Sequence, residues 1–324
     1  MYNSDQLLRM VNDAIAALPL EREPQELYAP MRYVLSLGGK RIRPILMLMA
    51  YNLYREDVEP CLMPAIGLET YHNFTLLHDD LMDRAEMRRG KACVHQKWDE
   101  NTAILSGDNM LILAFHYMMQ CDKKNMSAVM QIFSKTAIEI DEGQQYDINF
   151  ETRSDVTESE YIEMIRLKTS VLLACALQIG ATLADAPEQD TRALYRFGER
   201  LGLAFQLQDD YLDVYGDPAV FGKKIGGDIL CNKKTYMLIN ALHNASDTER
   251  AALRQWFLEK DCNPEEKIHA ITELYTKIGV DRMAKEQIDA YFVEAEACLF
   301  EVNLPEERKQ VLRNFAHGLM GRQN

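Results

Sequence analysis

Residues 64–83 read PAIGLETYHNFTLLHDDLMD, a stretch that is apolar on most sides until it ends in three carboxylates. Its apolar residues recur at spacings of three and four, which is typical of a helix and not of a strand. A helix that is apolar on most sides is expected to lie buried among other helices. Residues 102–119 and 171–184 have the same character, so the sequence predicts a large helical bundle.

The rest of the chain also reads as helix. Only 16 Gly and 10 Pro interrupt 324 residues, and almost no segment has the alternation of a strand. The sequence shows no internal repeat, low-complexity tract or linker, so we expect one all-α domain over residues 1–324. It would be a bundle of about ten or more helices around a central cavity. The further helices are expected at residues 7–18, from near 24 to 37, from 44 onward, and at 126–146, 158–183, 191–215, 235–245 and 247–260, with two more near the C-terminus.

Composition excludes several classes of protein. The formal net charge of −14 disfavours nucleic-acid binding and attachment to an anionic membrane surface, which both require excess basic residues. The first 20 residues lack the pattern of a signal peptide, and we expect no apolar run to be long enough to span a bilayer. The seven cysteines form no CxxC pair, which disfavours a zinc site or a disulfide framework and favours a reducing cytoplasm.

Two aspartate motifs follow apolar helical stretches. Asp79, Asp80 and Asp83 end the first stretch, and the same spacing recurs later in the chain. Clustered carboxylates repel one another unless a cation neutralises them, and carboxylate oxygens suit Mg²⁺. Because Mg²⁺ is commonly completed by substrate phosphates, the pair of motifs predicts a diphosphate or triphosphate ligand. The second motif consists of Asp209, Asp210 and Asp213.

Basic clusters lie close to both motifs in the sequence, and in so acidic a chain they indicate anion binding. They comprise Lys40, Arg41 and Arg43; Arg88, Arg89 and Lys91; and Lys223, Lys224, Lys233 and Lys234. The sequence contains no GxxxxGK[ST], GxGxxG, HExxH or GxSxG motif, so nucleotide hydrolysis, dinucleotide redox chemistry, zinc hydrolysis and serine hydrolysis lack their signatures. The chemistry predicted is metal-assisted departure of diphosphate.

Together these motifs resemble those of the trans-isoprenyl diphosphate synthases, also called the polyprenyl synthetase family, from residue 38 to beyond residue 233. The matching elements are GGKRIRP at 38–44, DDxxD at 79–83 followed by Arg88-Arg89-Gly90, GQxxD at 143–147, Lys168-Thr169, FQxxDDxxD at 205–213, GKxxGxD at 222–228 and KKT at 233–235.

This resemblance implies that the two motifs face each other, bind three Mg²⁺ ions and hold an allylic diphosphate. Asp79, Asp83 and Asp209 would be the principal ligands, with Asp80, Asp210 and Asp213 acting directly or through water. The groups implied at the allylic diphosphate and the developing cation are Arg88, Lys168, Thr169, Gln206, Lys223 and Lys233. Those implied at isopentenyl diphosphate, the second substrate, are Lys40, Arg43, His72 and Arg89.

In the family, bulky side chains below the first motif limit the length of the product. Phe74 lies five residues before Asp79, which corresponds to about 7.5 Å along a helix, and Thr75 and Tyr71 lie beside it. The expected product is therefore farnesyl or geranylgeranyl diphosphate. The same aromatic side chains could instead simply fill the core.

Several alternatives stay open at this point. A class I terpene cyclase shares the first motif but has no need of GGKRxRP. A non-catalytic partner subunit of a longer-chain synthase usually loses aspartates, whereas all six are present here. His72 is interpreted as a ligand of isopentenyl diphosphate and His78 as structural, and Gln144 and Asp147 fit either a role near the cation or a packing pair. Family members commonly form homodimers, which we also expect here.

Overall fold

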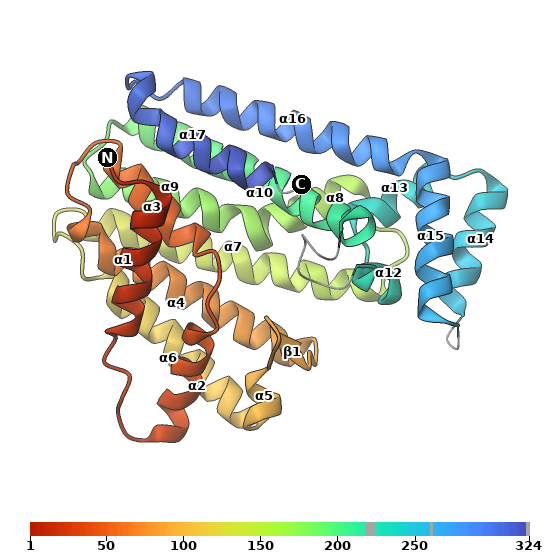
Figure 1. Cartoon of the computed structure of the whole chain (residues 1–324), viewed down its shortest axis with the longest axis horizontal. Coiled ribbons are helices and arrows are strands. Elements are labelled where there is room, and N and C mark those ends of the chain that lie inside the picture. Colours follow the sequence, from red (N-terminus) through yellow and green to blue (C-terminus); the bar gives the residue numbers. More distant parts are fainter. Residues whose placement is uncertain (218–224, 260–261, 322–324) are drawn as a thin grey trace. The chain divides into compact units, whose positions relative to one another are not determined.

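The computed structural model describes residues 1–217, 225–259 and 262–321, and it confirms the all-α prediction (Figure 1). These residues fall into two compact units, and the single domain over residues 1–324 stays a prediction. Unit 1 comprises residues 1–134, 176–192 and 304–312, and unit 2 comprises residues 135–175, 193–303 and 313–324. Helices α7, α9, α10 and α17 contribute residues to both units.

Unit 1 is built around α4 and α6, which pack along each other, with α2 and α3 against them. Helix α4 carries Pro60 in its first turn, where proline fits, and it then buries a nearly continuous series of side chains including Ile66, Leu68 and Tyr71. The first aspartate motif thus stands at the end of a rigid, buried helix. The helices of this unit are α1 (Ser4–Ala16), α2 (Gln25–Ser36), α3 (Ile42–Asn52), α4 (Glu59–Met82), α5 (Val94–Lys97) and α6 (Glu100–Met118).

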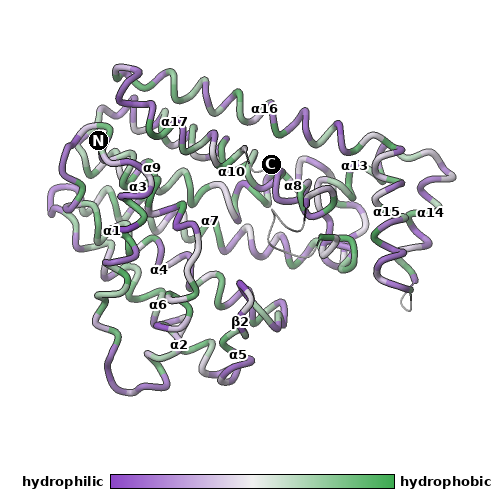
Figure 2. The backbone as a smooth tube through the Cα atoms, viewed as in Figure 1, coloured by the Kyte–Doolittle hydropathy of each residue, from purple (hydrophilic) through white to green (hydrophobic). Residues whose placement is uncertain are grey.

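Unit 2 has a second core, formed mainly by side chains of α8, α10, α13, α15 and α16. Capping boxes define the starts of α8 and α14, where Thr157 pairs with Glu160 and Ser246 with Glu249. The colours alternate between polar and apolar along α16, as expected of an amphipathic helix (Figure 2). The elements are α8 (Glu158–Ile165), α12 (Gly227–Leu230), α13 (Tyr236–Asn244), α14 (Asp247–Leu258), α15 (Pro264–Ile278) and α16 (Val280–Phe300).

Four long helices link the units in sequence. They are α7 (Met126–Thr152), α9 (Val171–Leu183), α10 (Glu188–Tyr215) and α17 (Glu306–Met320). The sequence placed most of these helices correctly, although α7 extends six residues beyond the expected end at residue 146 and α10 begins three residues earlier than expected.

Three local features differ from the sequence prediction. A two-residue hairpin joins β1 (Met87–Arg88) to β2 (Lys91–Ala92) where no strand was expected. The helix expected at 158–183 is divided by η1, a π-helix over Arg166–Ser170. The same span is long and apolar enough to cross a membrane, so the expectation of no such run was wrong, but 78% of its most apolar window is buried in protein. This span forms core because α9 is apolar on nearly all sides and almost all its side chains are buried.

Candidate active site in two halves

The first aspartate motif occupies the C-terminal end of α4. Asp79 and Asp83 lie four residues apart and therefore on one face, whereas Asp80 is buried. Both carboxylate oxygens of Asp80 accept hydrogen bonds of 2.8 Å from Arg88 Nε, and Arg88 Nη2 lies 2.7 Å from Oδ1. Asp80 and Arg88 are thus partners of each other in this structure. The contacts expected of Asp80 with the metal and of Arg88 with the allylic diphosphate stay predictions.

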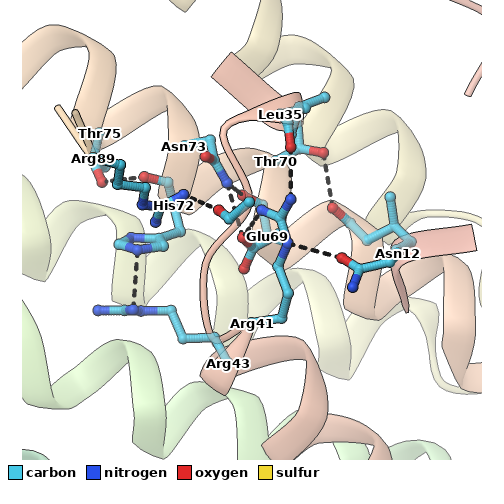
Figure 3. Close-up of polar contacts among 12 residues, drawn as sticks. Asn12, Leu35, Arg41, Arg43, Glu69, Thr70, His72, Asn73, Thr75 and Arg89 are labelled. Atoms are coloured by element: carbon cyan, nitrogen blue, oxygen red, sulfur yellow. Dashed lines mark hydrogen bonds and ion pairs between the residues drawn. The ribbon is translucent and has the colours of Figure 1, made fainter. Parts of the chain in front are cut away.

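Basic side chains gather around the part of α4 that contains Glu69 and His72 in unit 1 (Figure 3). Arg43 Nη1 donates to His72 Nε2 over 3.1 Å, so two groups predicted to hold isopentenyl diphosphate lie together. Arg89 donates through Nη1 to the carbonyl of Gly38. Gly39 permits this approach, because a Cβ at this position, where φ is +128°, would lie 2.8 Å from the Arg89 guanidinium.

Arg41, in contrast, turns away from these groups. Its Nη1 lies 2.7 Å from Glu69 Oε1 in a buried ion pair, and its Nη2 donates to the carbonyl of Leu35 over 2.6 Å (Figure 3). Asn73 also donates to Glu69 Oε1 over 3.0 Å, so the Glu69 carboxylate is held from two sides. The interpretation of Arg41 as part of an anion-binding cluster is therefore corrected, since it anchors the start of α3 to α4.

His72 is electrically neutral in this environment. Burial, followed by the charges of Arg43, Arg89 and other arginines, lowers the pKa of His72 well below its ordinary value. The hydrogen bond agrees with this, because a guanidinium can only donate and His72 Nε2 must therefore accept. Because His72 is neutral, only the arginine and lysine side chains contribute positive charge to this group of residues.

Below the first motif, aromatic rings form a contiguous cluster within unit 1. The Tyr71 ring lies 5.6 Å from Phe74 and 5.3 Å from Phe133, measured between ring centroids. Phe115 extends the cluster at 4.8 Å from Phe133. Thr75 donates to the carbonyl of His72 over 2.9 Å, so its hydroxyl stabilises α4 itself.

His78 has the setting of a structural residue. Its ring lies 4.8 Å from Phe74, and its Nε2 lies 3.2 Å from the carbonyl oxygen of Ile104 on α6. These contacts support the interpretation of His78 as structural.

The second aspartate motif lies near the end of α10 in unit 2. Asp209 and Asp213 share one face, and Asp213 Oδ2 accepts from the backbone N–H of Asp228 over 2.9 Å. Asp210 is buried and accepts from the Tyr161 hydroxyl and, over 3.1 Å, from Gln206 Nε2. Burial and the charge of Asp228 raise the pKa of Asp210 to about 7. As with Asp80, the predicted role of Asp210 in metal binding stays a prediction.

The π-helix η1 carries the two residues predicted to face the allylic cation. Lys168 Nζ lies 2.6 Å from Asp147 Oδ2, and the Thr169 hydroxyl donates to Gln206 Oε1 over 3.2 Å. Gly143 of α7 lies directly against η1, because a Cβ there would be 2.4 Å from the backbone nitrogen of Lys168. A π-turn inside a helix is frequently found at functional sites.

Some site residues were missed, and one predicted residue cannot be placed. Tyr161 and Glu69 were not singled out, although a tyrosine seven residues before Lys168 and a glutamate inside an apolar helix are both detectable signals. Asp147 forms an ion pair with Lys168, and the choice between a role near the cation and a packing pair for Gln144 and Asp147 stays a prediction. Lys223 lies outside the described residues, as does Lys224.

Each motif offers two carboxylates on one helix face. Within the described residues, no group of three or more His, Cys, Asp or Glu side chains could hold a metal ion. Two carboxylates nevertheless fit Mg²⁺, because this ion keeps several waters and takes substrate phosphate oxygens as its other ligands. That the motifs face each other across one cavity stays a prediction.

The fold and the two half-sites define the helical class of enzymes that carry paired aspartate-rich motifs. The chain belongs to the polyprenyl synthetase family, whose model matches residues 24–275. It is 44% identical over 226 residues to geranylgeranyl diphosphate synthase of Methanosarcina mazei, covering 69% of each chain.

Solved structures agree. A crystal structure of a geranylgeranyl pyrophosphate synthase matches with a TM-score of 0.94 and 42% identity, covering 100% of both chains. The Corynebacterium glutamicum geranylgeranyl pyrophosphate synthase, complexed with isoprenyl diphosphate and magnesium, matches with a TM-score of 0.85 and 28% identity over 98% of this chain and 97% of that one.

Proposed function

We propose that this chain is a short-chain trans-prenyltransferase that joins isopentenyl diphosphate head to tail to allylic diphosphates, with geranylgeranyl diphosphate as the main product. The observation that carries the proposal is the family match combined with both aspartate motifs and the groups around them. The geranylgeranyl synthases among its relatives favour the C20 product over farnesyl diphosphate.

The two motifs are proposed to hold Mg²⁺ together with the allylic diphosphate, and three ions are expected from the family. Asp79 and Asp83 of the first motif and Asp209 and Asp213 of the second would be the ligands. The structure of the relative from C. glutamicum contains isoprenyl diphosphate and magnesium, which supports magnesium as the metal. The metal supplies charge stabilisation for the departing diphosphate. Arg88, Lys233 and Lys223 would add positive charge at the same group.

The allylic cation is proposed to form beside η1. Lys168 is positioned by Asp147, and Thr169 is oriented by Gln206, so both residues are fixed before substrate binds. The Thr169 and Gln206 oxygens and nearby backbone carbonyls can direct their negative ends at the cation. Preorganisation of this kind stabilises charge without reorganisation at the moment of reaction.

Isopentenyl diphosphate is proposed to bind at Lys40, Arg43, His72 and Arg89 in unit 1. The Arg43–His72 contact supports this, because it brings a neutral imidazole and a guanidinium to one place. The carbon–oxygen bond to diphosphate breaks first, and the double bond of isopentenyl diphosphate then attacks the resulting allylic cation. A proton then leaves the condensation product, and the departing diphosphate accepts it.

The aromatic cluster is proposed to stop chain growth. We expect incubation with Mg²⁺, isopentenyl diphosphate and each of dimethylallyl, geranyl and farnesyl diphosphate to yield C20 as the dominant product by mass. Phe74→Ala should shift products beyond C20, because it opens the layer above Tyr71. Phe300→Ala is the matched control, since Phe300 is 75% exposed on α16. Unchanged products from Phe74→Ala would place the limit elsewhere, and no elongation from any starter would refute the function.

The carboxylates provide a second, independent test. Asp79→Ala and Asp209→Ala should each reduce Mg²⁺-dependent turnover by several orders of magnitude. Near-normal turnover in either variant would refute the metal site. Absence of elongation by the wild type with every starter, by contrast, would restore the terpene cyclase and partner-subunit alternatives, which the comparisons do not favour.

Assembly and location complete the proposal. We expect a homodimer in the cytoplasm, acting on small diphosphates, with no nucleic-acid partner and no stable insertion into a membrane. An apolar stripe formed by Ile104, Leu105 and Ile112 on α6 and by Met119, which follows the helix, supports the homodimer because its side chains are exposed in the single chain.

A further inference from the structure

Unit 2 contains a cavity of about 970 Å³ that the proposed reaction does not use. Three segments line it: residues 152–159 between α7 and α8, residues 232–243 up to α13, and residues 250–257 on α14. None of the motif aspartates, nor Lys168, Thr169 or Gln206, lines this cavity. Its volume lies near the upper end of the roughly 300–1,000 Å³ typical of ligand sites.

The polar side of the cavity is basic. Four permanent cations line it, Arg153, Lys234, Arg250 and Arg254, against two carboxylates, Asp155 and Glu158. Asp155 is already engaged, because its Oδ1 lies 2.8 Å from Arg153 Nε. Basic side chains outnumber acidic ones among the lining residues, although the chain carries a net charge of −14.

Two of these cations, Lys234 and Arg254, have no carboxylate partner among the residues that the structure describes. Lys234 Nζ donates to the backbone carbonyl of Glu151 over 3.1 Å. Arg250 donates to the carbonyls of Leu242 and Ala245, and its Nη1 lies 3.7 Å from Asp247 Oδ1. Arg254 forms no ion pair with any residue that the structure describes, and it stands exposed at the rim.

A buried charge lies behind the same wall. Lys267 is only 4% exposed, and its Nζ donates over 2.8 Å to Oδ1 of Asn232, which lines the cavity. The partner is a neutral amide, so the ammonium charge adds to the positive potential of the cavity wall.

The other side of the cavity is apolar. Leu238 and Ile239 belong to the core of unit 2, and Val156, Leu242 and Phe257 pack against that core and line the same space. A ligand that fits both sides needs an anionic head and a hydrocarbon tail. Inorganic phosphate would leave the apolar wall unused, and a neutral lipid would leave the cations without a counter-charge.

We propose that this cavity is a second, non-catalytic binding site for a prenyl diphosphate, the class of molecule that the enzyme produces. The head group binds at Lys234, Arg250 and Arg254, and the isoprenoid tail lies against Leu242 and Phe257. The inference rests on the proposed function for the identity of the ligand, and on the cavity alone for the existence of the site.

The chain connects this site to the reaction. Lys234 follows Lys233, which is expected at the allylic diphosphate, and Glu158 and Ser159 of the cavity open α8, which leads directly into η1. A ligand that moves either segment changes the position of Lys233 or Lys168. Occupancy of the cavity by product is therefore expected to slow turnover in a way that excess allylic substrate does not relieve.

The test is calorimetric titration of the full chain, with Mg²⁺, using farnesyl thiolodiphosphate, whose carbon–sulfur bond resists ionisation. Wild type should bind two equivalents per chain and Arg254→Glu one. Arg9→Glu, an equal change of charge at an exposed residue of α1 in unit 1, should still bind two. Inorganic diphosphate lacks the tail, so it should displace the second equivalent at least tenfold less effectively than a prenyl diphosphate does.

Turnover separates this inference from the proposed function. With little product present, the initial rate of Arg254→Glu should match that of wild type. In wild type, inhibition by product should persist at a tenfold excess of allylic substrate. Arg254→Glu should lose this inhibition. One equivalent bound by wild type, two bound by Arg254→Glu, or a lower initial rate in Arg254→Glu would each overturn the second site. Flotation with phosphatidylglycerol vesicles that depends on Arg254, without a second equivalent of prenyl ligand, would assign the basic residues to a membrane surface and also overturn it.

Discussion

At the scale of single residues, the middle carboxylate of each motif differs from its neighbours. Asp80 accepts from Arg88 and Asp210 from Tyr161 and Gln206, so each is held inside its own unit. The first and third carboxylates are left on a common face of the helix. The DDxxD spacing therefore gives two carboxylates that are proposed to bind the ligand and one that fixes the end of the helix.

Tyr161→Phe tests this fixing role. The variant removes the hydroxyl that donates to buried Asp210, so we expect the free energy of unfolding to fall by about 1–3 kcal/mol. We also expect kcat to fall more than KM changes, because Asp210 adjoins Asp209. Denaturant unfolding and steady-state kinetics measure the two effects. Tyr146→Phe is the control, since Tyr146 is 47% exposed on α7, and equal behaviour of the two variants would contradict the role.

His72 predicts a dependence of stability on pH. Its folded pKa lies well below the unfolded value of about 6.5, so between these values only the unfolded chain binds the proton. The contribution of His72 is complete above about pH 6.5 and is lost as pH falls below it, by at most about 1.4 kcal/mol per pH unit. Between pH 7.5 and 5.5, His72→Gln should lose less stability than wild type in denaturant unfolding, while His243→Gln, at an exposed position, should follow wild type. An identical pH profile for His72→Gln would refute the assignment.

Sequence reasoning at this scale identified residue types but not the directions of their side chains. Arg41 and Arg43 are two residues apart, yet one is buried against Glu69 and the other contacts His72. The difference arises at the start of α3, where Arg41 has a left-handed backbone with φ of 47°. A cluster of basic residues in the sequence does not determine such a turn. The structure was therefore needed to assign the separate roles of Arg41 and Arg43.

At the scale of elements, η1 decides where Lys168 and Thr169, the residues proposed to face the allylic cation, point. A π-turn adds a residue to the local turn of the helix, so Lys168 and Thr169 stand where a regular α-helix would not place them. Gly143 leaves room for this widened turn. The regular helices were predictable from their apolar spacing, but this interruption was not, since RLKTS carries no proline or glycine.

Gly143→Ala is the test at this scale. Its Cβ would meet the backbone of Lys168 and Leu167, so η1 must shift, and we expect a loss of about 1–3 kcal/mol in stability and a fall in kcat of tenfold or more. Gly318→Ala on α17 is the matched control. A Cβ there meets nothing within 4 Å, so this variant should be neutral or stabilised by up to about 1 kcal/mol. Full activity in Gly143→Ala would show that the position of η1 does not matter for turnover.

At the scale of the whole molecule, the surface carries information that the sequence pattern only suggested. Leu105 and Ile112 on α6 are 61% and 65% exposed and lie seven residues apart, two helical turns along one face. The sequence indicates that this helix is apolar on most sides. This pattern predicts that the helix is buried but does not identify what covers it. The structure of one chain buries the opposite side of α6 against α4 and leaves this stripe uncovered.

We expect a second copy of the chain to cover the stripe. Ile112→Glu would place a carboxylate in the apolar interface, which costs about 2 kcal/mol or more, so the dimer Kd should rise by roughly thirtyfold or more. Sedimentation equilibrium over a range of protein concentrations measures this change. Val293→Glu, at a 67% exposed position on α16, is the matched control and should leave the dimer intact. A monomeric wild type, or equal dissociation of both variants, would show that α6 is not the interface.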